Sequence, residues 1–319
     1  MASLKQVSFL VSFLVLLHLS VRAEKRKMDC ESWGPPRVIG ELDRAIKEAS
    51  GLAISTKYPS RFYHINDSGD AGVIYQSDSY GALQKKIILD IQKPLDGEAL
   101  SLGPCGVKFS SKDSKQCLYF GDIGDNNLKR TEILITVLEE AESFSTPAAV
   151  LRQHRLKYPS GARNAESMAV HPNGDLFIIS KAQIAEDDHV GPAEIFTLSA
   201  EELWGSQEAL KTMRKIGEIN LPEILKEHEV FGQIATDMSI ANDGKSFLIL
   251  TYQKILQFHF DIAKFDKNFL DFTIIHPKQL PQQEGISFLP RSSTSFVYST
   301  EFHKSAPLVQ MDCSNHTML

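Results

Sequence analysis

The chain has 319 residues and a formal net charge of −6, from 34 basic and 40 acidic side chains. Hydrophobic residues make up 42% of the chain, which is enough for a large buried core and excludes a disordered, low-complexity protein. No long face of Lys and Arg occurs, which excludes a strongly basic nucleic-acid-binding protein.

The N-terminus has the features of a secretory signal peptide. Lys5 precedes an apolar run at residues 7–19, and residues 21–23 fit a cleavage site. This run is short for a membrane span, and no later apolar run approaches the about 18 residues that a span needs. We therefore expect residues 1–23 to be a signal peptide. Residues 24–319 are expected to form one secreted, extracellular domain without stable membrane insertion.

Five copies of one pattern follow in chain order. Each copy starts at a polar or acidic residue, continues through an apolar strand and a turn, and ends in a second apolar strand. The copies recur at intervals of about 50 to 70 residues, which is typical of propeller blades. The leading residues are Ser50, Glu98, Glu166, Asp237 and Glu284. The second strands are expected at residues 61–65, 118–123, 176–180, 247–252 and 296–300.

Further strands complete each repeat, so the sequence predicts an all-β, five-bladed β-propeller. Six blades is the alternative, if a degenerate copy lies in one of the long intervals. A short helix is expected at residues 42–49. The last repeat has only three strands, and residues 37–41 near the N-terminus are expected to supply the fourth and close the ring.

The four cysteines are expected to form two disulfides, as is usual in secreted proteins. Closure of the ring by an N-terminal strand would bring Cys30 close to Cys313. Cys105 and Cys117 flank one hairpin connection, where facing strands meet the geometry of a disulfide. Asn315 lies in a sequon on the C-terminal tail and is the expected glycosylation site.

The repeat predicts a metal centre, because the first strand of every propeller blade lines the central axis. Four carboxylates at one register would repel one another strongly unless they are protonated, hydrated or bound to a cation. Ca²⁺ accepts six to eight oxygen ligands and suits such a set, with Mg²⁺ as the alternative. The predicted metal ligands are Ser50, Glu98, Glu166, Asp237 and Glu284.

The connections that leave the second strands add candidates for chemistry. Two of them are dense in Asp, Asn and Gly, which offer oxygen ligands and close backbone approach. The candidate acid–base residues there are His64, Asp67 and Asp125. The other residues expected to line this pocket are Asn66, Asp122, Asn126, Lys181, Tyr252 and Glu301.

These motifs resemble those of a family of secreted microbial propeller proteins, largely of unassigned function. The matching segments are residues 50–53, 64–69, 121–126, 164–167, 236–237 and 283–285. Asn164 stands where that family has Asp, and residues 96–98 read Asp-Gly-Glu, where that family has a Trp before the Glu. The predicted architecture is also similar to that of calcium-activated nucleotidases (apyrases), in which Ser and Glu side chains hold an axial Ca²⁺.

Two functions fit this interpretation. The first is a metal-dependent hydrolase of an ester or phosphoester, in which the metal activates water. The second is a non-catalytic binding or scaffold propeller with a structural axial metal. In either case the expected partner is a small molecule or another extracellular ligand, not nucleic acid, and the protein is expected to be a monomer. An open coordination position beside the Asp- and Asn-rich loops would favour the hydrolase.

Overall fold

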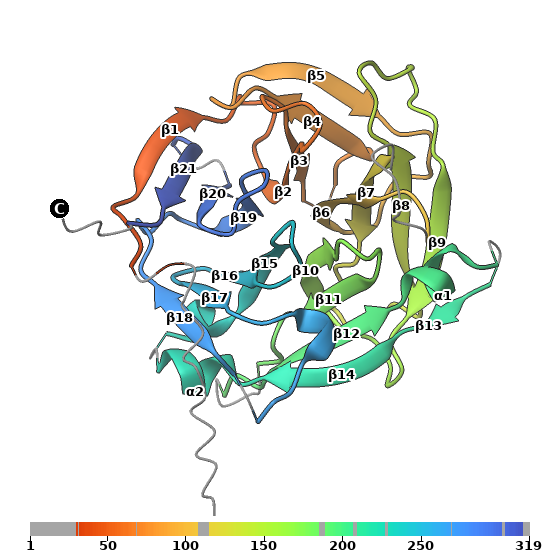
Figure 1. Ribbon diagram of the computed structural model, residues 1–319. Coiled ribbons are helices and arrows are strands. Elements are labelled where there is room, and N and C mark those ends of the chain that lie inside the picture. The colour runs from red at the N-terminus through yellow and green to blue at the C-terminus, as the bar shows by residue number, and fades with distance from the viewer. Residues whose placement is uncertain are drawn as a thin grey trace, which may run out of the picture.

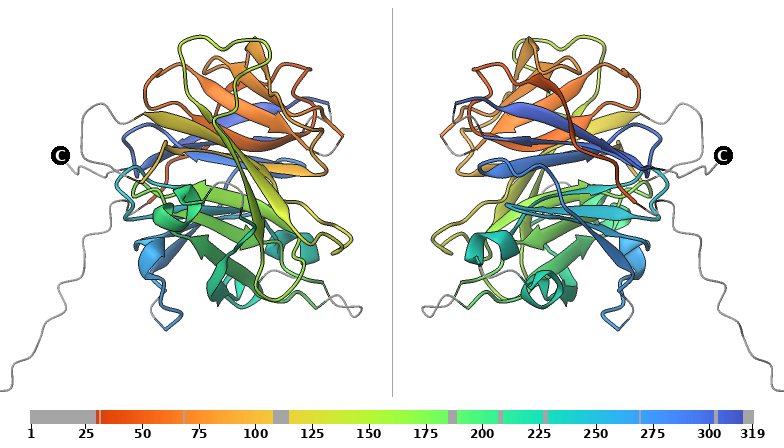
Figure 2. Two further views of the ribbon diagram at one scale, coloured as in Figure 1. Left: turned by 90° about the vertical axis from the view of Figure 1, so that its right-hand side faces the viewer. Right: turned by 90° about the vertical axis from the view of Figure 1, so that its left-hand side faces the viewer.

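Alternating apolar residues and tight turns fold the chain into five antiparallel sheets around a central axis (Figure 1). The computed structural model describes residues 30, 32–67, 69–107, 115–184, 189–206, 209–226, 229–268, 270–301 and 304–314. The five sheets confirm the prediction of a five-bladed propeller. The expected signal peptide and Asn315 lie outside the described residues. Seen from the side, the sheets are strongly twisted (Figure 2).

The blades are built alike, from an innermost strand outward. The innermost strands are β2 (Ala49–Ile54), β6 (Gly97–Pro104), β10 (Ala165–Val170), β15 (Ala235–Ile240) and β19 (Gln283–Phe288). The second strands are β3 (Phe62–Asn66), β7 (Gln116–Asp122), β11 (Leu176–Ser180), β16 (Phe247–Thr251) and β20 (Ser295–Thr300). The third strands are β4 (Val73–Ser77), β8 (Ile133–Glu139), β12 (Ala193–Leu198), β17 (Ile255–Phe258) and β21 (Pro307–Asp312). The outermost strands are β5 (Leu83–Ile88), β9 (Arg152–Lys157), β14 (Arg214–Ile219), β18 (Phe272–Ile275) and β1 (Arg37–Glu41).

A few short elements lie outside this scheme. The two-residue strand β13 (Lys211–Thr212) pairs in parallel with β9 and gives the second blade a fifth strand. The helical elements are α1 (Ala200–Trp204), α2 (Leu221–Leu225), and the 3₁₀ turns η1 (Val230–Gln233) and η2 (Ile262–Lys264). None of the helices in the described part of the chain is long and apolar enough to cross a membrane.

The core consists of apolar layers between neighbouring blades. Five clusters of buried side chains each join two adjacent blades, and the last of them joins the fifth blade to the first. Tyr119 and Met168, for example, are fully buried between the second and third blades. Because each blade buries both faces, the ring supports itself and leaves its axis free for polar side chains.

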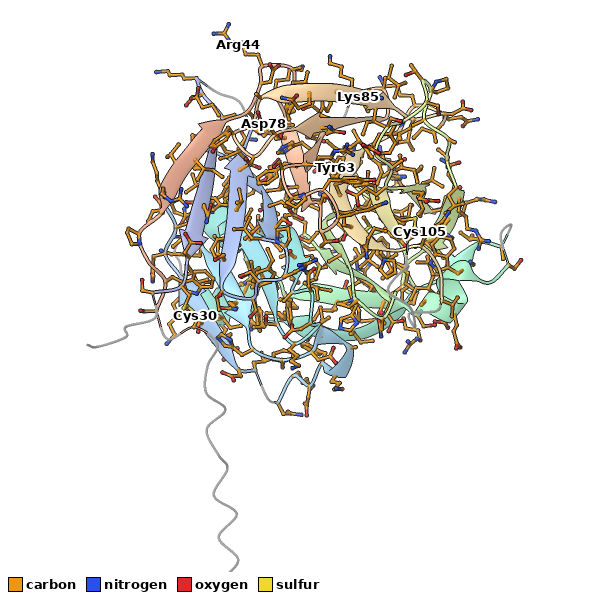
Figure 3. The ribbon with its side chains drawn as sticks, turned by 45° about the horizontal axis from the view of Figure 1, so that its top comes forward. Cys30, Arg44, Tyr63, Asp78, Lys85 and Cys105 are labelled. Carbon is orange, nitrogen blue, oxygen red and sulfur yellow. A yellow bond between two sulfur atoms is a disulfide. The ribbon has the colours of Figure 1, made fainter. Side chains whose placement is uncertain are left out.

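The two chain ends meet in the fifth blade. β1 pairs antiparallel with β21, so the blade contains strands from both ends of the chain. The Cys30–Cys313 disulfide lies beside this pairing, with 5.6 Å between its Cα atoms. Cys105 and Cys117 form the second disulfide, and Figure 3 shows Cys30 and Cys105 on opposite sides of the ring. Both pairings agree with the prediction, and two disulfides are compatible with an extracellular location.

The helix predicted at residues 42–49 is wrong. The segment forms a turn, in which Ile46 donates its backbone N–H to the Asp43 carbonyl at 2.8 Å. The Asp43 side chain accepts the Ala45 N–H at 2.9 Å, a local bond that competes with helix formation. Ala49 already belongs to β2, which leaves too few residues for a helix.

Candidate functional site

Each innermost strand is irregular near its first residues. The pairing of β6 with β7 passes from Gly97 to Ala99, so Glu98 forms a bulge. A bulge turns a side chain away from its regular position in the strand. All five irregularities lie at the same end of the central axis, where the innermost strands begin, and we call this end the acid end. The residues at the five irregularities are Ser50, Glu98, Glu166, Thr236 and Glu284.

The register contradicts the prediction that Asp237 is one of the five equivalent residues. Thr236 occupies that position, and Asp237 pairs regularly with Leu250 of β16. Both carboxylate oxygens of Asp237 accept backbone N–H groups, from Met238 at 2.8 Å and from Ile286 of the next blade at 2.7 Å. Asp237 therefore links the fourth blade to the fifth.

Three carboxylates form a compact group at the acid end. Oxygen atoms of Asp67, Asp96 and Glu98 all lie within 4.8 Å of one another. Glu98 is only 3% exposed, whereas Asp67 and Asp96 are half-buried. Ser50 donates to Glu98 Oε2 at 2.8 Å and holds that carboxylate in place. The group thus has a buried side and a side open to solvent.

The environment of this group opposes ionisation. Burial raises the pKa of Glu98 well above its usual value, and the negative charge of Glu166 raises it further. Burial and the neighbouring Asp67 raise the pKa of Asp96 to about 6. Gly124 packs so closely that a Cβ there would collide with the Asp96 carboxylate and with Glu98. A cation in this group would relieve the repulsion among the three carboxylates.

A second polar group lies on the blades across the axis. The Lys181 ammonium contacts Glu166 Oε1 and lies 3.3 Å from the Tyr252 hydroxyl. Tyr252 in turn donates to Glu284 Oε1 at 2.9 Å. Glu166 Oε2 is buried and has no hydrogen-bond partner among the described residues. This orphaned oxygen is an available ligand atom.

The charged groups on the axis influence one another's pKa values. Burial raises the pKa of Glu166 to about 7, although Lys181 opposes the shift. Burial and the charges of Glu166 and Glu301 raise the pKa of Glu284 to about 9. Burial disfavours the charged form of Lys181, but Glu166, Glu98 and Glu284 outweigh that effect and raise its pKa. Lys181 is therefore a fixed cation facing the acids.

These shifts predict that the metal-free protein loses stability as the pH rises from 7 to 9. Between the ordinary pKa of Glu and about 9, native Glu284 retains a proton that the unfolded chain has already released. Each rise in pH within this range therefore favours the unfolded chain, and the stabilising contribution of the protonated Glu284 is lost once the pH passes about 9. The expected loss over this range is about 2 kcal/mol in the free energy of unfolding. Urea unfolding in chelator at pH 7, 8 and 9 measures it. Glu284→Gln should flatten the profile, and an unchanged profile in this variant would contradict the assignment.

His64 does not lie in the acidic group, which corrects its predicted role as an acid–base residue. It sits in the middle of β3, between Leu52 of β2 and Tyr75 of β4, and has no exposed surface. Its Nε2 is 3.0 Å from the Ser77 hydroxyl, and burial lowers its pKa to about 3. A neutral, enclosed imidazole of this kind supports the core of the blade.

Asp125 is also a framework residue and not the predicted base. Its two carboxylate oxygens accept the backbone N–H groups of Lys129 and Arg130, at 2.9 and 2.7 Å. Its own N–H donates to Asn164, whose amide donates to Asn126. The loop after β7 is therefore held by its own Asp125 and by Asn164, which lies just before β10 of the next blade.

Asp122 and Asn66 position the backbone around the acidic group. Asp122 accepts the N–H of Asp96 at 2.9 Å and pairs with Arg130 at 2.7 Å, so it fixes the segment that carries Asp96. Asn66 accepts the N–H of Glu48 and donates to the Ala45 carbonyl, which anchors the segment before β2.

The sequence pattern did not indicate Asp96 or Thr236 as site residues. Asp96 lies two residues before Glu98, where a strand would put it on the same side as the repeated acid, and that spacing was an available signal. Thr236 precedes the acid Asp237, and the pattern gave no reason to prefer the uncharged neighbour.

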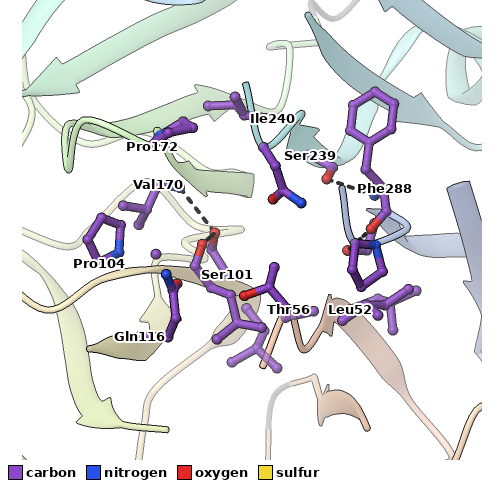
Figure 4. Close-up of a pocket in the computed structure, with 18 of the residues that line it drawn as sticks. Leu52, Thr56, Ser101, Pro104, Gln116, Val170, Pro172, Ser239, Ile240 and Phe288 are labelled. Atoms are coloured by element: carbon purple, nitrogen blue, oxygen red, sulfur yellow. Dashed lines mark hydrogen bonds between the residues drawn. The ribbon is translucent and has the colours of Figure 1, made fainter. Parts of the chain in front are cut away.

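The opposite end of the axis contains a cavity of about 350 Å³ (Figure 4). The Ser101 and Ser239 hydroxyls line it and accept backbone N–H groups of the next blades, from Val170 at 3.0 Å and Phe288 at 3.1 Å. Arg291 is the one charged residue among its described lining. Since the hydroxyls already serve as links between blades, the acid end is the stronger candidate for chemistry.

Comparison with known proteins identifies similar folds and no family. No protein-family model matches the chain, and no curated protein matches its sequence. The chain is similar to a gluconolactonase from Xanthomonas campestris at 12% identity and a TM-score of 0.44, covering 86% of this chain and 74% of that one. It is also similar to the soluble aldose sugar dehydrogenase from Escherichia coli, at 8% identity and a TM-score of 0.44, covering 89% of this chain and 100% of that one. Neither is a nucleotidase.

Proposed function

We propose that the acid end holds a divalent cation and that the protein hydrolyses a small ester or phosphoester. The group of Asp67, Asp96 and Glu98, with oxygens within 4.8 Å of one another, carries this proposal. Carboxylate oxygens are the ligands that hard cations prefer, and the irregular set favours Ca²⁺ over the strictly octahedral Mg²⁺. Asp67 and Asp96 are half-buried, so one side of the group faces solvent.

The residues divide into three roles. Glu98 and Asp96 would hold the cation, and the orphaned Glu166 Oε2 offers a further oxygen. A bound cation supplies Lewis acidity, which polarises a substrate oxygen and lowers the pKa of water. Asp67, on the exposed side, is the residue placed to take a proton from the attacking water. Ser50 keeps Glu98 oriented through its 2.8 Å hydrogen bond.

One observation favours a second candidate, a binding propeller with a purely structural centre. The contact of Lys181 with Glu166 already supplies a positive charge on the axis. Such a fixed cation can balance part of the negative charge without any chemistry, and propellers of similar architecture serve many functions.

Metal content and hydrolysis, measured on one preparation, test the proposal. Elemental analysis should find Ca²⁺, and p-nitrophenyl acetate or bis(p-nitrophenyl) phosphate should be hydrolysed with Ca²⁺ and not in chelator. Asp67→Asn should lower kcat about 100-fold, the effect expected for loss of a general base. Asp243→Asn, the same change in an exposed turn at the opposite end, is the matched control. Bound metal without hydrolysis would favour the second candidate, and absence of both metal and hydrolysis would contradict the first.

A further inference from the structure

A second pocket opens at the acid end, beside the second blade. It has a volume of about 370 Å³ and lies where β8 begins and β9 ends. Its polar lining includes Arg130, Glu132, Lys157, Tyr158, Arg163 and Thr212. Three of these side chains are cations, in contrast with the acids on the axis.

The two arginines are held in place and still have donors to offer. Arg130 Nη1 donates to Asp122 and to the Gly124 carbonyl, at 2.7 and 2.9 Å. Arg163 pairs with Glu194 through Nε and donates from Nη1 to backbone carbonyls. Within the described part of the chain, neither Nη2 group has a hydrogen bond. Arg130 also donates from Nε to the Glu132 carbonyl at 3.2 Å, so each guanidinium is held through Nε and Nη1 and keeps its Nη2 group for an oxygen anion.

Lys157 and Tyr158 complete the lining. Lys157 is exposed and forms no ion pair with the residues that the structure describes. The Tyr158 side chain is 6% exposed, and its hydroxyl has no hydrogen-bond partner among those residues. Burial raises the pKa of Tyr158, the charges of Arg130 and Arg163 act against that rise, and the charge of Asp125 adds to it. A buried hydroxyl without a partner is costly, and a ligand oxygen would satisfy it.

The pocket adjoins the acidic group. Arg130 donates to the carbonyl of Gly124, and Gly124 packs directly against Asp96 and Glu98. Arg130 also pairs with Asp122, which holds the backbone of Asp96. One loop segment therefore separates the cationic pocket from the carboxylates.

We propose that this pocket binds an anionic oxygen group, a carboxylate or a phosphate, through Lys157, Tyr158 and the two arginines. Resting on the proposed function, this assigns the substrate class as a small ester that also carries a free anionic group. The anion lies in the pocket and the scissile bond lies at the acidic group. The cationic pocket would thereby select negatively charged substrates, although the neighbouring group of Asp67, Asp96 and Glu98 is itself acidic.

Calorimetric titration of the full mature protein with inorganic phosphate and with acetate tests the pocket. The titration is made in chelator at constant ionic strength, so that an anion bound to metal does not contribute. Lys157→Gln should weaken binding of the preferred anion about tenfold, the loss of a charge-assisted hydrogen bond. Tyr158→Phe should weaken it about fivefold and leave Tm unchanged or higher, because only an unpartnered hydroxyl is removed. Lys86→Gln, the same charge change on β5 of another blade, should have no effect.

These titrations test anion binding in the pocket independently of the proposed hydrolysis reaction. Tighter binding of phosphate or of acetate shows which anion the substrate carries. Anion binding that persists in chelator and weakens in the two variants supports the pocket, even if no hydrolysis is found. Binding that vanishes in chelator, or that is equal in wild type, Lys157→Gln and Tyr158→Phe, would overturn it.

Discussion

Excess Ca²⁺ is expected to raise the Tm of the metal-free protein by several degrees, and Glu98→Gln should abolish most of that rise. A ligand that binds only the native state stabilises it by about 2.7 kcal/mol at 100 times its Kd. Glu98 is 3% exposed and its pKa is raised, so without metal its protonated form resembles glutamine in charge and size. Glu98→Gln should therefore lower Tm in Ca²⁺ and matter little in chelator, whereas Glu166→Gln should lower Tm in both conditions, because it removes the partner of Lys181.

The matched control is Glu140→Gln. Glu140 is 2% exposed and accepts a hydrogen bond from Tyr63 at 3.0 Å, away from the axial carboxylates. Its substitution should change Tm equally with and without Ca²⁺. Thermal unfolding in both conditions measures all three variants. Equal losses for Glu98→Gln in Ca²⁺ and in chelator would refute the axial metal.

Removing the Cys30–Cys313 disulfide by a double substitution to serine is expected to cost about 5 kcal/mol in the free energy of unfolding. The bond joins residues separated by 283 positions, so it restricts nearly the whole unfolded chain. The β1–β21 pairing still closes the ring, so the variant is expected to fold. Urea unfolding of the variant and of wild type measures the loss.

The second disulfide provides the comparison. Cys105 and Cys117 are separated by 12 positions, and the same loop-entropy argument predicts about 3 kcal/mol for their removal. If the short-loop variant loses more stability than the long-loop variant, the bond at the chain ends does not act by restricting the unfolded chain.

The blades could be predicted from the sequence because each repeats an apolar strand, a turn and a second apolar strand. Strand β11, for example, spans Leu176–Ser180, the range that its pattern predicted. The repeated acids Glu98, Glu166 and Glu284 were found by the same reasoning. They lie at equivalent bulges, because one polar residue per blade must face the axis.

The details of the site depend on single-residue shifts that a pattern does not encode. Thr236 and Asp237 are neighbours, and only the register of β15 decides which of them is at the bulge. His64 was grouped with the loop after the second strand although the predicted strand at residues 61–65 already contained it, and β3 continues to Asn66 and encloses the imidazole. Asp96 joins Glu98 because the segment before β6 is fixed by Asp122 from another strand, a long-range contact that the local sequence does not show.

The meeting of both chain ends in one blade determines how the molecule bears mechanical load. A pull applied between the N- and C-terminal tails passes through the Cys30–Cys313 bond, which lies in parallel with the entire ring. The blades between these residues then carry none of the tension. Attached by both tails to a surface or to fused domains, the oxidised ring keeps its acid end undistorted, and the reduced ring opens first between β1 and β21.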